Sequence, residues 1–101
     1  MGIHKNSNEN MDDHHLYEII DSEENIVYKY GICGKPLNSD GTSPRANEQV
    51  TMFNRLVGYV QYFANILLIG IPGRVKAKQI EKEYISKFEQ ENGRRPRGNP
   101  Q

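Results

Sequence analysis

Apolar and polar residues alternate with a period of two in two short runs near the start of the chain. These runs cover about residues 14–20 and residues 26–33. Successive side chains of a strand point to opposite faces. The second run therefore has four residues on one face and three on the other, namely Ile26, Tyr28, Tyr30 and Ile32 against Val27, Lys29 and Gly31. The polar segment DSEEN between the runs predicts that they form an antiparallel hairpin.

A helical period begins after a loop rich in Gly, Pro, Asn and Ser. Apolar residues recur there three or four positions apart and form one stripe, which consists of Ala46, Val50, Phe53 and Val57. Ser43 precedes Pro44, which is typical of an N-cap followed by proline at the first helical position. The pattern predicts a helix over about residues 44–56.

Two further elements complete the predicted fold. The short apolar run NILLIG, residues 65–70, predicts a third strand in the centre of the sheet. Residues 73–91 read as a second helix, which ends at a C-cap signal, Asn92-Gly93. The order β-β-α-β-α predicts a mixed α/β (α+β) domain, in which an antiparallel three-stranded sheet is flanked by helices.

One acidic residue lies on the apolar side of the second helix. At about 100° per residue, the buried stripe of this helix consists of Ala77, Ile80, Tyr84 and Phe88. Glu81 falls at the edge of that stripe, where an ionised carboxylate is costly unless it is paired or binds a cation. A salt bridge, or a side chain that reaches solvent, explains the position equally well. A single carboxylate there can also hold Mg²⁺, with waters and phosphate oxygens as the other ligands.

The length of 101 residues fits one domain. Residues 1–13 are rich in Asn and Asp and show no periodicity, so we expect a disordered lead or junction, followed by a domain over residues 14–101. We expect the last nine residues to lie outside the core as well. The chain shows neither a membrane span nor a signal peptide. Its single cysteine, Cys33, excludes an internal disulfide and reads as a half-buried strand residue.

The charges are balanced in total but unevenly distributed. Thirteen basic and thirteen acidic residues give a formal net charge of zero, which argues mildly against a non-specific nucleic-acid binder. Residues 1–24 contain seven acids and one Lys or Arg, whereas residues 25–101 contain twelve bases and six acids. The part that is predicted to fold is therefore basic.

Basic residues occur at two places where the fold gains little from them. Arg45 falls in the first turn of its helix, where the helix dipole favours acids over cations. It can serve a phosphate, although arginine is also common on helix surfaces. The C-terminal tail carries Arg94, Arg95 and Arg97 close to Asn99. Taken alone, this tail reads as a solvated basic terminus.

The order of these features resembles the GIY-YIG nucleases over about residues 14–99. The resemblance rests on HLYEI for the first half-motif, YKYGI for the second, Arg45 in SPRAN, Glu81 in AKQIEKEYI and Asn99 in PRGN. The segments YKYGI, SPRANEQV, IPGR and NGRRPRGN also look like the small GIY-YIG modules at the C-terminal ends of bacterial polymorphic toxins.

This resemblance implies an endonuclease that hydrolyses phosphodiester bonds of nucleic acid with one Mg²⁺ or Mn²⁺ ion. DNA is the favoured substrate, but the sequence does not distinguish it from RNA. Tyr17 matches a general base or water-orienting group, and Arg45 matches the arginine that stabilises the phosphate. Glu81 matches the sole protein ligand of the metal. Asn99 matches a late asparagine that orders the site.

Two positions depart from the family pattern. His15 stands where the first half-motif has glycine. When Gly31 is aligned on the glycine of the second half-motif, Lys29 takes the place of the second tyrosine. Tyr28 is then one residue away, on the opposite face of the strand. We expect Lys29 to bind the phosphate as a cation or to change the proton route, and Tyr28 and Tyr30 to be structural.

Three functions remain open at this point. The first is a nuclease that acts as a toxin module, exported within a larger protein into a target-cell cytoplasm and neutralised by an acidic immunity protein. The second is a catalytically silent GIY-YIG-like domain that binds nucleic acid or a protein partner. The third is a structural domain without a site. A nuclease needs Glu81 beside Tyr17 and Arg45 in an open cleft, whereas a structural domain would bury Glu81 against a basic partner.

Overall fold

The computed structural model of the chain describes residues 11–100 and confirms the α+β class and the predicted order of elements. The elements are β1 (Asp13–Asp21), β2 (Ile26–Cys33), α1 (Pro44–Val57), β3 (Tyr62–Pro72) and α2 (Arg74–Asn92). Most of the expected disordered lead, residues 1–10, lies outside the described residues. Within residues 11–100, neither helix is long and apolar enough to cross a membrane.

The sheet is antiparallel throughout, and its strand order is β2-β1-β3. The prediction that the third strand is central was therefore wrong, because β1 lies in the centre and β3 at an edge. Burial explains the difference. Residues 14–17 of β1 are all buried, whereas Leu68 and Ile69 in the apolar run of β3 are exposed. An apolar run thus marked a strand here but not its position in the sheet.

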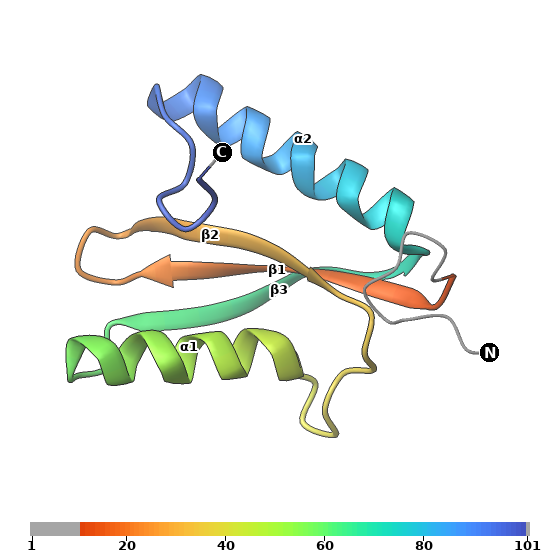
Figure 1. The fold of residues 1–101 in the computed structure, drawn as a ribbon, viewed down its shortest axis with the longest axis horizontal. Helices are drawn as coiled ribbons and strands as arrows, with labels where there is room; N and C mark the ends of the chain where they lie inside the picture. The colour runs from red at the N-terminus through yellow and green to blue at the C-terminus, as the bar shows by residue number, and fades with distance from the viewer. Residues whose placement is uncertain (1–10, 101) are drawn as a thin grey trace.

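The two helices cover opposite faces of the sheet (Figure 1). On one face, α1 places Ala46, Val50 and Phe53 against a cluster that includes Tyr17 and Ile19. On the other face, α2 packs a stripe of residues against a cluster of strand residues, with Ala77, Ile80 and Tyr84 on the helix and Leu16, Ile32 and Ile71 on the strands. The stripes predicted from helical spacing are confirmed, except that Val57 in the last turn of α1 is exposed.

A bulge in β2 changes the face on which Tyr28 lies. The pairing of β1 with β2 shifts between Ile19, which faces Lys29, and Ile20, which faces Val27. The extra residue, Tyr28, packs with its ring against Phe53 and Tyr62 on the α1 face. Strict alternation had placed Tyr28 and Lys29 on opposite faces of the strand. That expectation was wrong, because a bulge inserts one unpaired residue into the ladder and so brings both side chains to the same face.

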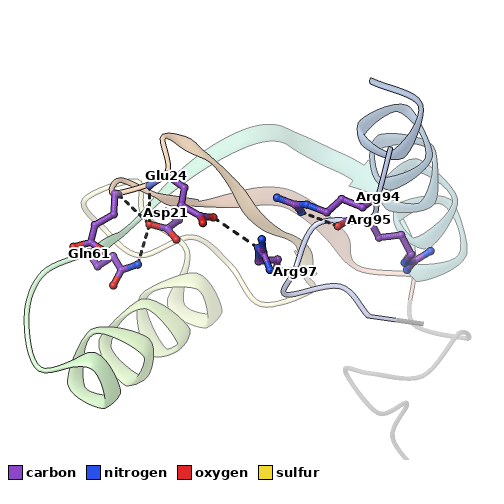
Figure 2. Close-up of polar contacts among 7 residues, drawn as sticks. Asp21, Glu24, Gln61, Arg94, Arg95 and Arg97 are labelled. Atoms are coloured by element: carbon purple, nitrogen blue, oxygen red, sulfur yellow. Dashed lines mark hydrogen bonds and ion pairs between the residues drawn. The ribbon is translucent and has the colours of Figure 1, made fainter. Parts of the chain in front are cut away.

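The C-terminal tail folds back beside β2 rather than extending into solvent (Figure 1). Pro96 is among the most fully buried residues, and the Gly98 amide donates a hydrogen bond to the carbonyl oxygen of Tyr28 at 2.7 Å. Figure 2 shows Arg97 facing Glu24 of the β1–β2 turn, with 3.7 Å between the guanidinium Nε and a carboxylate oxygen. The expectation of a solvated tail outside the core was therefore wrong. Its arginines contribute to local structure.

Candidate functional site

A cleft of about 300 Å³ lies along the edge strand β2, between the first turns of α1 and α2. It brings together the five residues that the sequence singled out, which are Tyr17, Lys29, Arg45, Glu81 and Asn99. They come from both hairpin strands, both helices and the tail. The cleft is open, and among the described residues that line it Glu81 is the only carboxylate, in the company of four Lys and Arg side chains.

Local capping at the start of α1 directs Arg45 into the cleft. Ser43 caps the helix by accepting a hydrogen bond from the Ala46 amide at 3.2 Å, and Pro44 is the first helical residue, as predicted. The ring nitrogen Nε2 of the buried His15 lies 2.7 Å from the Ser43 hydroxyl. His15 therefore anchors this cap to β1. Arg45 is the second residue of this helix, and its Nη1 donates to the carbonyl oxygen of Ile32 at 3.1 Å.

The Tyr17 side chain reaches the cleft by passing over Gly31 of the neighbouring strand β2. Its ring lies over Gly31, and a Cβ atom at that position would overlap the ring and the hydroxyl of Tyr17. The hydroxyl donates a hydrogen bond to Oε1 of Gln49 at 2.8 Å. Burial raises the pKa of Tyr17 above its ordinary value, although the positive charge of Arg45 and the hydrogen bond to Gln49 oppose this shift. Tyr17 is therefore a neutral phenol at physiological pH.

Lys29 shares the α1 face with Tyr17, since it pairs with Ile19 in the sheet. Its side chain is partly buried, and burial lowers the pKa of its ammonium group. The carboxylate of Glu81 raises that pKa, and Arg45 lowers it. Tyr30 points to the other face, where its ring packs edge-on against Tyr84. As expected, Lys29 lies in the cleft while Tyr28 packs in the core, and Tyr30 both packs and lines the cleft wall.

Glu81 lies in the second turn of α2 and is partly buried at the edge of the apolar stripe, where the helical spacing placed it. Burial raises the pKa of its carboxyl group. The positive charges of Lys29, Arg74, Lys78 and Arg45 counteract this, in decreasing order. Within residues 11–100, no group of three or more His, Cys, Asp and Glu side chains could hold a metal ion. The cleft therefore offers one carboxylate, and further ligands would have to come from water or substrate.

Asn99 completes the free edge of β2. Its side-chain amide pairs with the backbone of Tyr30 in both directions: Oδ1 accepts from the Tyr30 amide at 2.8 Å, and Nδ2 donates to the Tyr30 carbonyl oxygen at 2.9 Å. The side chain thus replaces one residue of a neighbouring strand. Arg95 supports it, because its Nε donates to the Asn99 carbonyl oxygen at 2.8 Å.

We expect Asn99→Asp to destabilise the protein by about 1–3 kcal/mol, because an isosteric carboxylate loses the donor and faces the Tyr30 carbonyl oxygen. Urea unfolding of both proteins at neutral pH measures the difference. Unchanged stability would show that this pairing does not hold the tail in place.

The cleft also contains functional candidates that the sequence reading missed, namely Gln49, Arg74 and Lys78. Arg74 is the first residue of α2, so it repeats the position of Arg45 at the start of α1. Neither helix has an acidic residue in its first turn. The argument from the helix dipole that singled out Arg45 therefore applied equally to Arg74, which also lies in the first turn of the helix predicted over residues 73–91.

Comparison with known proteins shows the family. A search of curated proteins and a search of solved structures returned no significant match. A family model described as URI fold toxin 2 matches residues 7–93, which is most of the chain and includes every site residue named above except Asn99. The match covers the sheet and both helices that form the cleft. The chain belongs to the URI fold toxin 2 family, and it is a toxin module.

Proposed function

We propose that this toxin module is a metal-dependent endonuclease that hydrolyses phosphodiester bonds of nucleic acid, DNA in preference to RNA. The observation that carries the proposal is the convergence of Tyr17, Lys29, Arg45 and Glu81 in one open cleft, with Asn99 at its edge. Tyr17, Arg45, Glu81 and Asn99 follow the order of the GIY-YIG pattern, and Lys29 stands at the position of its second tyrosine. They also include the groups that phosphodiester hydrolysis needs, which are cations for the phosphate, a carboxylate and a polar group for water.

Arg45 and Lys29 supply positive charge to the scissile phosphate. Arg45 is oriented by its bond to Ile32, so a substrate does not have to order it. The lowered pKa of Lys29 makes its ammonium group a stronger acid than an exposed lysine. Lys29 can therefore donate the proton that the leaving oxygen needs, in place of the second tyrosine of the motif.

Tyr17 serves this reaction as a water-orienting group rather than as a base. Because its raised pKa keeps the phenol protonated, and because its proton is engaged by Gln49, its oxygen remains able to accept a hydrogen bond from the attacking water. That arrangement fixes the position of the water, and the proton that the water loses on attack passes to solvent in the open cleft.

A divalent ion would fit the cleft only if the substrate and water supplied most of its ligands, because the protein offers one carboxylate. Mg²⁺ commonly uses one or two carboxylates and completes its shell with water and phosphate oxygens. Glu81 would hold the ion, and the ion would neutralise charge that develops on the phosphate. The four cations that line the cleft repel a metal ion when no nucleic acid is bound. We therefore expect tight metal binding only when nucleic acid is present.

Incubation of the purified protein with plasmid DNA and with tRNA tests the proposal directly. We expect cleavage in Mg²⁺ that stops in EDTA, with DNA cleaved faster. Binding of nucleic acid without cleavage in any divalent metal would favour the alternative, a silent binding domain. The raised pKa of Tyr17 and the lysine at the second tyrosine position are the two observations that favour this alternative.

Arg45→Ala is expected to lower the cleavage rate at least tenfold, about 1.4 kcal/mol, at nearly unchanged stability. The reason is that its charge lies in the cleft while the helix dipole gains nothing from it. Arg55→Ala in the exposed last turn of the same helix is the matched control, since this arginine does not line the cleft. Equal rates for the two variants would remove Arg45 from the site.

A toxin of this kind needs an inhibitor in the cell that makes it. We propose an acidic immunity protein that covers the cleft, because its cations attract acidic surfaces as they attract phosphate. Lys29 and Arg45 carry this argument, whereas Arg94, Arg95 and Arg97 of the tail are engaged in contacts within the protein. Expression in a bacterial cytoplasm should arrest growth with loss of DNA, and Glu81→Gln should not. Harmless accumulation of active enzyme would contradict toxicity by cleavage.

A further inference from the structure

The cleft carries more positive charge than one phosphodiester can neutralise. Its lining contains four cations, Lys29, Arg45, Arg74 and Lys78, against the single carboxylate of Glu81. One phosphodiester bears one negative charge, and a divalent ion would add two positive ones. The charge balance therefore fits a ligand with at least two neighbouring phosphates.

Arg74 carries buried hydrogen-bond donors that the described part of the protein does not satisfy. Two of its guanidinium nitrogens, Nε and Nη1, are buried and have no hydrogen-bond partner within residues 11–100. Its position at the start of α2 adds the positive end of the helix dipole, and Gly73 before it provides no side-chain cap. Buried donors without an acceptor are costly, so an anion in the cleft would relieve an unfavourable state.

Lys78 follows Arg74 after one helical turn and connects the cleft to a second groove. This groove, of about 510 Å³, runs along α2 and shares Lys78 and Glu81 with the cleft. Apolar and basic side chains line it together, namely Val75, Ile85, Lys82 and Arg95. Such a lining suits the sugar and base of a nucleotide with a phosphate beside them.

Arg45 and Arg74 therefore divide the cleft between them. Arg45 lies near Tyr17 and is tied to β2, where the proposed water and scissile phosphate meet. Arg74 lies on α2, one helical turn before Lys78, which the cleft shares with the groove. We propose that Arg74 and Lys78 form a second subsite, which binds the phosphate next to the scissile one in a nucleic-acid strand. The inference rests on the proposed nuclease function and makes a strand with consecutive phosphates the substrate.

Chimeric DNA decamers test this subsite. In the reference decamer every linkage is an uncharged methylphosphonate except one central phosphodiester, which is the only cleavable bond. Two further decamers carry a second phosphodiester, immediately 5′ in one and immediately 3′ in the other. Product length identifies which bond was cut. We expect the added charge on one side to accelerate cleavage of the central bond about tenfold.

Arg74→Gln should abolish that acceleration, and Lys76→Gln should retain it. Lys76 is the matched control because it is exposed on the same helix and lines neither cavity. Thermal unfolding of all three proteins verifies that the variants fold. An acceleration of equal size in Arg74→Gln and wild type would overturn the subsite, as would its absence in wild type. Failure to cleave an unmodified decamer or plasmid DNA would instead overturn the nuclease function itself.

Discussion

Replacing Glu81 with glutamine is expected to abolish cleavage and, at neutral pH, to raise the melting temperature. The two effects have one cause. Burial raises the pKa of Glu81, which means that the fold pays to keep this side chain ionised. An ionised carboxylate at this position lowers the stability of the protein. Its place beside an open cleft suggests that it is kept for a role in the site. Glutamine has the same shape but cannot replace an ionised metal ligand.

The pH dependence of stability distinguishes this cause from a general effect of the substitution. A carboxyl group with a raised folded-state pKa destabilises the protein above that pKa and ceases to do so below its unfolded-state pKa, about 4.3. We therefore expect the stability advantage of Glu81→Gln to be largest at neutral pH and to disappear on acidification toward pH 4. For the same reason, we expect kcat/KM to fall on acidification with an apparent pKa above the ordinary pKa of a glutamate.

Glu83→Gln provides the control for both measurements, because Glu83 is exposed on the same helix and does not line the cleft. Its activity and melting temperature should stay close to wild type. Plasmid nicking and thermal unfolding are measured on the same samples. Full activity of Glu81→Gln would exclude Glu81 as the metal ligand. A lower melting temperature at neutral pH would mean that its neighbouring cations outweigh the cost of burial.

The elements of the fold could be predicted because their signals are local. The stripe of Ala77, Ile80 and Tyr84 has the helical period, and the same spacing placed Glu81 at the edge of the core. Ser43 with Pro44 marked the start of α1 for the same reason, since a cap depends on its immediate neighbours.

Features that depend on pairing between distant segments could not be predicted in this way. The edge position of β3 depends on which strand β1 pairs with, and nothing in NILLIG records that choice. The bulge that turns Tyr28 toward α1 is a property of the ladder between two strands. Arg74, by contrast, lies in the first turn whether α2 begins at residue 73 or 74, so the dipole argument that singled out Arg45 could have found it from the sequence.

Gly31→Ala is expected to cost both stability and activity, because a single methyl group would occupy the space of the Tyr17 ring and hydroxyl. Tyr17 is almost fully buried among core residues, so a shift of its ring would disturb the packing around it. Overpacking of this kind costs about 1–3 kcal/mol. The displaced hydroxyl would also lose its bond to Gln49 and its place in the cleft.

A double-mutant cycle with Tyr17→Leu shows whether this contact is the cause. Leucine keeps apolar volume near the backbone but lacks the ring atoms that the new methyl group would meet. If the overlap is responsible, Gly31→Ala should destabilise wild type in urea but have little effect in the Tyr17→Leu background, since residues in contact are not additive. An equal loss in both backgrounds would mean that position 31 requires glycine for a reason other than Tyr17. The close approach of the Tyr17 ring to Gly31 would then not be what excludes a larger residue there.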